Sequence, residues 1–143
     1  MGATVLLSNR MDEGSAVSMG GYLVLNPEDG GIDYNNATLL HEYGHFLQTR
    51  QWGGIATLGT SIDSGLSAGL KWRSIGKHKD IWIEKDANAR ALSYFGNRLD
   101  DTQRERFSRK YPGQYFDDNL SKRCFFPFLF PFWFYESITF SDR

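Results

Sequence analysis

The amino-acid sequence predicts one α+β domain, which we place at residues 1–120, and three observations favour this fold class. The chain has 143 residues, enough for a single hydrophobic core but too few for two domains. Its first third contains short apolar runs bounded by glycine, asparagine and proline, a pattern typical of strands. Two later segments carry apolar and small residues at the spacing of amphipathic helices. Together these observations predict a small mixed or antiparallel sheet packed on two helices.

Two strands are expected before the first helix. Thr4–Leu7 (TVLL) is a short apolar run that a polar loop follows. Tyr22–Leu25 (YLVL) is the stronger candidate, because Gly20-Gly21 precede it and Asn26-Pro27 follow it. Glycine and proline interrupt regular structure, so they define both ends of this second strand.

The first expected helix spans roughly Ala37 to Gln51. Either Asn35 or Asn36 can cap it, because an asparagine side chain accepts a hydrogen bond from the free N–H groups of the first turn. The run Trp52-Gly53-Gly54 ends it. Apolar residues along this segment are available to pack against the sheet.

The second expected helix spans Ile81 to Leu99, and the charged run from Asp100 to Lys110 after it is interpreted as a solvated helix face. Residues 55–70 between the two helices are small, apolar and glycine-rich, which suits a buried loop or a weakly predicted helix. Residues 71–80 are polar and basic, and we expect them to be exposed. The residues that share the inner face of the second helix are Ile81, Glu84, Ala87, Asn88, Ala91 and Phe95.

Composition excludes several classes of function. The net charge of −1 provides no electrostatic reason to expect nucleic acid as a partner. The single cysteine, Cys124, excludes an internal disulfide framework and leaves too few ligands for a zinc finger. No secretory signal or membrane-spanning helix is evident, which favours a cytoplasmic location. The sequence makes no prediction of the oligomeric state.

Residues 121–143 form an aromatic-rich C-terminal tail. From Cys124 to Tyr135 it reads CFFPFLFPFWFY, which is shorter than the ~20 residues of a spanning helix and contains two prolines that break helices. We favour an extended apolar segment that packs under the domain. A contact with a membrane interface through Phe125–Tyr135, or a tail that is not part of the folded domain, are the alternatives.

The five residues HEYGH inside the first helix carry the main functional signal. His41 and His45 are four apart on a helix, so both imidazoles point the same way and can reach one metal ion. Glu42 is then placed to hold and deprotonate a water molecule, and Gly44 leaves room near the metal. The alternative is two histidines on a helix surface with no ligand.

The third ligand decides the subclass of metal site. A histidine six residues beyond His45, in the pattern HExxHxxGxxH, is excluded because Gln48 and Gln51 occupy the glycine and histidine positions. Glu84 stands out because it is an acid on the small-residue face of its helix, where an unpaired carboxylate would be costly to bury. Its alternative role is a first-turn partner of the helix dipole.

Three other residues stay open as ligands. Asp86 lies off the inner face, and we expect it to cap, to pair with a lysine or arginine, or to brace a ligand histidine. Asp63 is the runner-up ligand, since the segment GTSID faintly resembles the GTxD element of zincins that use aspartate as the third ligand. His78 lies in a polar loop and is either solvated or a stabiliser of the oxyanion.

The two helical motifs together resemble the small gluzincin metallopeptidases, in particular the catalytic domain of the ImmA/IrrE type. HEYGH is followed by E-x-x-A-N-x-x-A at Glu84–Ala91, and the resemblance covers about residues 20–99. It implies a zincin-like fold, with zinc bound by His41, His45 and Glu84 and with Glu42 as general base. It also implies that an edge strand aligns an extended peptide substrate, a role assigned to Tyr22, Leu23, Val24 and Leu25. The chain departs from the family in two places: the glycine-rich loop from Trp52 to Asp80 carries no recognised motif, and the aromatic tail has no known counterpart.

The predicted function is zinc-dependent hydrolysis of peptide bonds, with a peptide or protein as the substrate and Zn²⁺ as the cofactor. His78, Tyr94 and Arg90 are candidates for the donor that holds the oxyanion. A zincin-like binding module without proteolysis, which would contact a partner or membrane through the tail, is the alternative. Hydrolysis of a non-peptide amide is a third function that the same chemistry allows.

Overall fold

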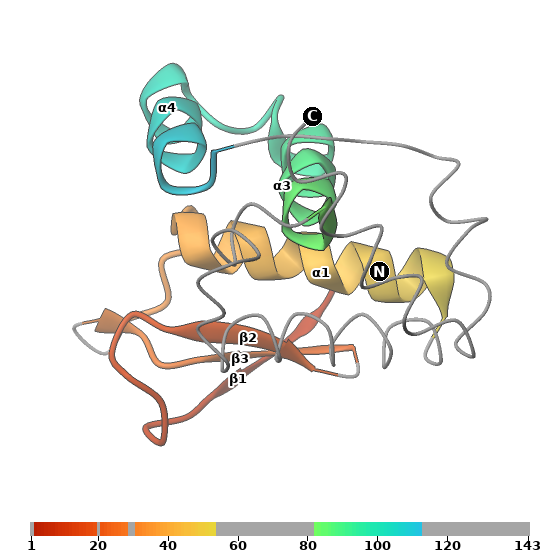
Figure 1. The fold of residues 1–143 in the computed structure, drawn as a ribbon. Helices are drawn as coiled ribbons and strands as arrows, with labels where there is room; N and C mark the ends of the chain where they lie inside the picture. The colour runs from red at the N-terminus through yellow and green to blue at the C-terminus, as the bar shows by residue number, and fades with distance from the viewer. Residues whose placement is uncertain (1, 20, 29–30, 54–81, 113–143) are drawn as a thin grey trace, which may run out of the picture.

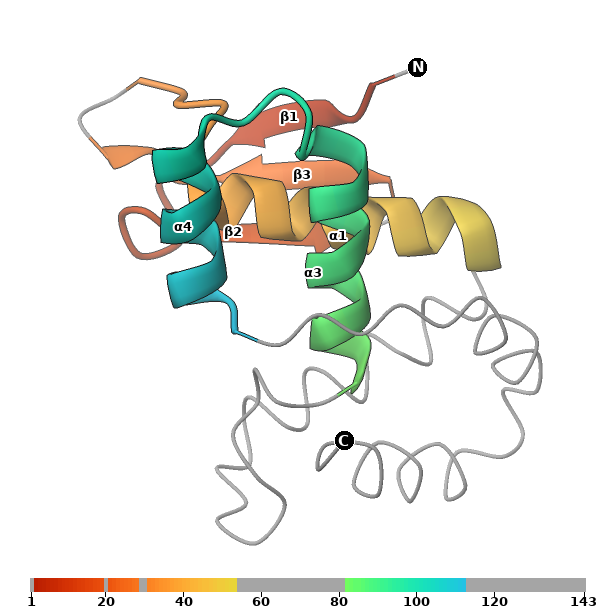
Figure 2. The same ribbon diagram turned by 90° about the horizontal axis from the view of Figure 1, so that it is seen from above.

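The computed structural model describes residues 2–19, 21–28, 31–53 and 82–112. Its elements, in order, are β1 (Thr4–Leu7), β2 (Ala16–Met19), β3 (Tyr22–Leu25), α1 (Ala37–Trp52), α3 (Trp82–Phe95) and α4 (Asp101–Lys110). The sheet lies against one side of α1, and α3 and α4 lie side by side across its other side (Figures 1 and 2). The predicted α+β class is confirmed.

The three-stranded sheet is mixed, with the order β1-β3-β2. β3 pairs with β1 in parallel and with β2 in antiparallel register, so that Val24 faces Leu6 on one side and Val17 on the other. β2 was not expected from the sequence. The assignment of Tyr22–Leu25 to a sheet edge is wrong, because β3 is the central strand; β2 lies at one edge and pairs with β3 alone among the described residues.

Both well-defined helix starts carry asparagine or aspartate caps. The Asn36 side chain accepts a hydrogen bond from the Thr38 N–H at 2.8 Å, which confirms one of the two expected caps of α1. α4 begins with a reciprocal capping box between Asp100 and Gln103. α4 is mainly exposed, as expected for a solvated helix face, but Phe107 is only 1% exposed.

Two apolar clusters hold the layers together. The first lies between the sheet and α1 and is formed by Leu23, Leu39 and Phe46. The second joins α1, α3 and α4, and its buried residues are Leu40, Ala91, Leu99 and Phe107. Because α1 contributes to both clusters, apolar burial orders it on two sides, and burial of this kind stabilises by roughly 25 cal/mol per Å².

Several predictions concern residues outside the described ranges. Asp63 and His78 lie within residues 54–81, and the end of the domain at residue 120 and the tail at residues 121–143 lie within residues 113–143. These predictions stay open. Among the described helices, none is long and apolar enough to cross a lipid bilayer.

Gly44 allows a close approach of α1 and α3. A Cβ atom added at Gly44 would lie 2.7 Å from the carbonyl carbon of Ala87 and would also clash with the Ala87 carbonyl oxygen. The sequence interpretation that Gly44 leaves room near a metal is therefore replaced by a packing role. Without a side chain at Gly44, the backbone of α3 can pack directly against α1. Gly44 lies between His41 and His45 in the sequence, and Ala87 lies three residues after Glu84.

Gly44→Ala is expected to lower the free energy of unfolding by about 1–3 kcal/mol, because the methyl group must push against backbone rather than a flexible side chain. Urea denaturation followed by circular dichroism measures the change. Gly31→Ala is the matched control, since nothing lies within 4 Å of a Cβ at Gly31. Equal stability of the two variants would contradict the packing role.

Candidate metal centre

His41, His45 and Glu84 meet between α1 and α3. The Nε2 atom of His41 lies 3.0 Å from the Oε2 atom of Glu84, and the Nε2 atom of His45 lies 3.2 Å from the same oxygen. Each residue offers one donor atom, and these atoms all lie within 4.8 Å of one another. The three side chains therefore form a group that could hold a metal ion.

The helix geometry explains why these residues converge. His41 and His45 are one turn apart on α1, and Glu84 belongs to the first turn of α3. Glu84 is only 3% exposed, so it is not a solvated partner of the helix dipole. A carboxylate with so little access to water needs a cation or strong donors, and both imidazole Nε2 atoms lie within 3.2 Å of it.

Asn88 fixes the orientation of His41. The Nδ1 atom of His41 lies 2.7 Å from the Oδ1 atom of Asn88, and both side chains are buried. Because an amide oxygen only accepts, the proton of a neutral His41 belongs on Nδ1, which leaves the Nε2 lone pair directed toward the group. The ring of Tyr111 stacks on the His41 ring, with centroids 4.2 Å apart and an angle of 4° between the planes.

Gln48 fixes the orientation of His45 in the same way. The Nδ1 atom of His45 lies 2.8 Å from the Oε1 atom of Gln48. The Gln48 amide nitrogen donates in turn to the Ile83 carbonyl at 2.8 Å and to the Asp86 carboxylate at 2.7 Å. His45 is thus linked through a glutamine to a buried acid on α3.

The position of Asp86 differs from the one that the sequence predicted. We expected it off the inner face of its helix, but it is 0% exposed. Its burial is compensated by an ion pair with Arg90 one turn later and by the Gln48 amide. Asp86 therefore has two of the predicted roles. It forms an ion pair with Arg90, and it supports His45 indirectly, because it accepts a hydrogen bond from Gln48.

Gln48→Leu is expected to weaken metal binding about 10- to 100-fold, the usual cost of losing a partner that orients a ligand histidine. Competition with a chromophoric zinc chelator measures the affinity. Gln51→Leu is the control, because Gln51 lies one turn later on α1 and donates nothing to either histidine but accepts from Arg90. The same affinity in both variants would show that Gln48 does not orient His45.

Charges within the group shift the pKa values of its members. Burial alone would raise the pKa of Glu84, but the charge of His45 and hydrogen bonds from both histidines lower it well below its usual value. Burial alone would lower the pKa of His45, but the Glu84 carboxylate raises it to about 9. Both shifts favour the charged forms, an imidazolium at His45 and a carboxylate at Glu84.

Glu42 lies next to His41 in α1 but is not one of the three residues that could hold a metal ion. Its Oε2 atom accepts a hydrogen bond from the backbone N–H of Ser18 in β2 at 2.7 Å. Burial raises the pKa of Glu42, although the charges of His45 and His41 lower it in part. The Glu42 carboxylate therefore lies between β2, which forms a sheet edge, and the two histidines.

A cavity of about 350 Å³ opens onto these residues. The segment leading into β2, the first turns of α1, α3 and the end of α4 all contribute to its walls, which include Ala16, Thr38, Glu42, Lys110 and Tyr111. Sequence reasoning missed Ser18, Lys110 and Tyr111, because nothing in the local pattern shows that the sheet edge and the end of α4 return to the histidines.

Two residues suggested as oxyanion donors lie elsewhere. Tyr94 packs against Tyr43 and Phe95, and it lines a second cavity with Arg90. Arg90 is held by Asp86 and Gln51. Neither residue lines the cavity that contains Glu42, so both suggestions are wrong.

Comparisons with protein-family models, with curated proteins and with solved structures find no match for this chain. The group of His41, His45 and Glu84 does not by itself identify a gluzincin.

Proposed function

We propose that this chain is a zinc-dependent peptidase of the gluzincin type. The observation that carries the proposal is the convergence of two imidazole nitrogens and a carboxylate oxygen next to a separate half-buried glutamate, Glu42. Two histidines and one carboxylate are a ligand set that catalytic zinc sites use, and a four-coordinate ion keeps one position for water or substrate. Asn88 and Gln48 accept the Nδ1 protons of His41 and His45, so a neutral imidazole at either position presents its Nε2 lone pair to a metal.

Zinc held by these residues would supply a Lewis acid that polarises a carbonyl group and acidifies water. Glu42 accepts the proton of the attacking water and returns it to the leaving amine. Burial raises its pKa above that of an exposed glutamate, and a carboxylate with a higher pKa is a stronger base. The hydrogen bond from the Ser18 backbone N–H fixes the position of the Glu42 carboxylate.

Substrate alignment is assigned to β2 in place of β3. The N–H of Ser18 points away from β3, since it donates to Glu42, and Ala16 of the same strand lines the cavity. An extended peptide that adds to this edge would run past Glu42 and the metal group. The proposal therefore favours unfolded or loop segments as substrates.

The test is metal content together with cleavage of a broad library of quenched peptides. About one zinc per chain, cleavage that a chelator abolishes, and recovery with added zinc are expected. Cleavage that persists in chelator would overturn the metal mechanism. A protein that binds zinc but cleaves no peptide would instead be the zincin-like binding module or act on another amide.

Zinc binding is expected to release about one proton per chain at pH 7, because His45 with a pKa of about 9 must lose its proton to coordinate. The apparent affinity therefore rises with pH and levels off above about pH 9, and proton release disappears there. Calorimetry in two buffers with different ionisation enthalpies measures the number of protons. Zinc binding at pH 7 without proton release would contradict this protonation state.

A further inference from the structure

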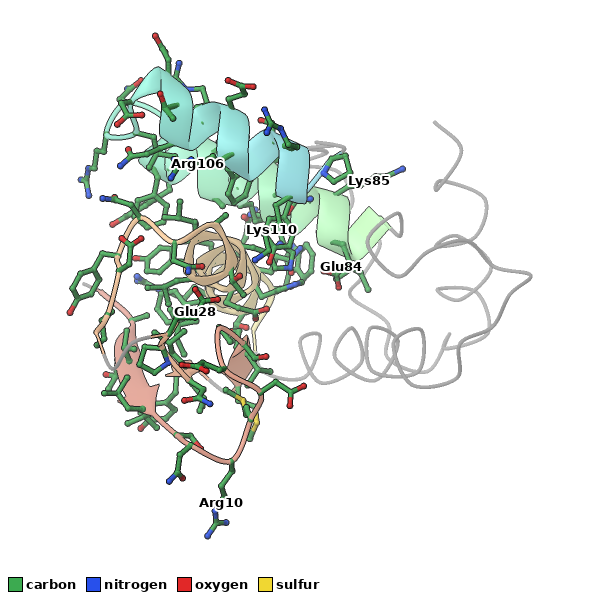
Figure 3. The ribbon with its side chains drawn as sticks, turned by 90° about the vertical axis from the view of Figure 1, so that its left-hand side faces the viewer. Arg10, Glu28, Glu84, Lys85, Arg106 and Lys110 are labelled. Atoms are coloured by element: carbon green, nitrogen blue, oxygen red, sulfur yellow. The ribbon has the colours of Figure 1, made fainter. Side chains whose placement is uncertain are left out.

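Lys110 brings a positive charge to the wall of the cavity. It is the last residue of α4, and its Nζ atom donates to the Thr38 hydroxyl at 2.7 Å. Thr38 lies in the first turn of α1, one turn before Glu42. Lys110 and Glu84 are labelled in Figure 3, and both line the same cavity.

The Lys110 ammonium has no acidic partner among the described residues. The acids of the described ion pairs, Glu84, Asp86, Asp101 and Glu105, each pair with other residues, and the first turn of α1 carries no acid. Its contacts are the neutral Thr38 hydroxyl and the Tyr111 ring, whose centroid is 5.8 Å away. An ammonium has three donors, so two N–H groups stay available to an acceptor in the cavity.

The charge balance of the cavity favours an anion. Among the described residues that line it, Glu42 and Glu84 are the acids, and the two charges of a bound zinc ion would balance them. Lys110 then leaves an excess of one positive charge. The hydrogen bond to Thr38 fixes the position of the Lys110 Nζ atom, so the donor for a bound carboxylate is already in place.

We infer that this site prefers peptides with a carboxylate near the scissile bond, which Lys110 binds. The inference rests on the proposed function and names its substrate class. The carboxylate belongs either to an aspartate or glutamate side chain or to the free C-terminus of a short peptide. Both sources present the same chemistry to the ammonium.

The test uses binding rather than turnover. Short peptide hydroxamates, which chelate zinc, are made in two matched pairs: a glutamate against a glutamine side chain, and a free carboxyl terminus against a carboxamide. Their dissociation constants are measured on the zinc-loaded protein. We expect the carboxylate member of one pair to bind about tenfold more tightly than its amide, and the pair that shows the difference identifies the source.

Lys110→Gln is expected to abolish that preference, and Lys110→Glu to transfer it to a hydroxamate with a lysine side chain. Arg109→Gln is the control, because Arg109 lies in the same turn but pairs with Glu105 at 2.6 Å and does not line the cavity. Equal binding of both members of both pairs, or an unchanged preference in Lys110→Gln, would overturn the inference and leave the peptidase proposal standing. A protein that binds no zinc would overturn both.

Discussion

Glu42→Gln is expected to keep zinc and to lower the rate of peptide hydrolysis by about 10²- to 10⁴-fold, the usual contribution of a general base. Glu42 is not one of the three residues that could hold the metal, so the ligand set is unchanged. The amide oxygen can still accept the Ser18 N–H, which preserves the position of the side chain. What the amide cannot do is take a proton from water. Metal analysis and a quenched-peptide assay on the same preparation measure both effects.

The variant also separates chemistry from folding. Because burial raises the pKa of Glu42, a neutral amide at this position should not lower stability, and thermal unfolding should start no earlier than in the parent. A variant that cleaves peptides as fast as the parent would show that another group acts as the base. Loss of zinc in this variant would instead place Glu42 among the ligands.

The helices were predictable because their signals are local. The 3.6-residue period, the Asn36 cap and the glycine after Trp52 together gave bounds for α1 within one residue of those observed. The second helix ends earlier than expected, at Phe95, because the chain turns at Gly96 before the next cap at Asp100. Leu99 follows Phe95 at helical spacing, so the apolar period runs past the end of the helix and does not mark it.

The sheet order was not predictable in the same way. β2 has four residues, and its alternation is too short to stand out from the loop around it. Whether Tyr22–Leu25 is central or at an edge depends on which segments pair with it, and pairing is a property of the tertiary structure. The expectation that placed it at the edge came from a family resemblance, whereas this sheet has β3 at its centre.

The site was predictable where a residue carried a signal of its own. His41 and His45 did so through their i, i+4 spacing and Glu84 through the cost of burying a carboxylate, and the structure brings the three together. Gln48 did not, because a glutamine on a helix is ordinarily solvated, yet its amide connects His45 to Asp86. Tyr111 and Lys110 reach the cavity only because Phe107 anchors α4 against α1 and α3, a contact no local pattern reveals.

Glu84→Gln is expected to weaken zinc binding by more than about 100-fold, exceeding the loss from a residue that only orients a ligand. The change keeps the size of the side chain but replaces the single carboxylate of the group by a neutral amide, a much weaker ligand for zinc. It also removes the charge that raises the pKa of His45, so the proton released on zinc binding at pH 7 should disappear with it. Chelator competition and calorimetry measure the two effects.

Glu42→Gln and Glu84→Gln form a matched pair, because each replaces one acid that lines the same cavity by its amide. The proposed roles require opposite results: zinc retained and hydrolysis lost at Glu42, zinc lost at Glu84. If Glu84→Gln kept stoichiometric zinc, the third ligand would have to come from elsewhere, and Asp63 and His78 would be the residues to replace next. The pair therefore separates a base from a ligand by a measurement of metal alone, before any substrate is known.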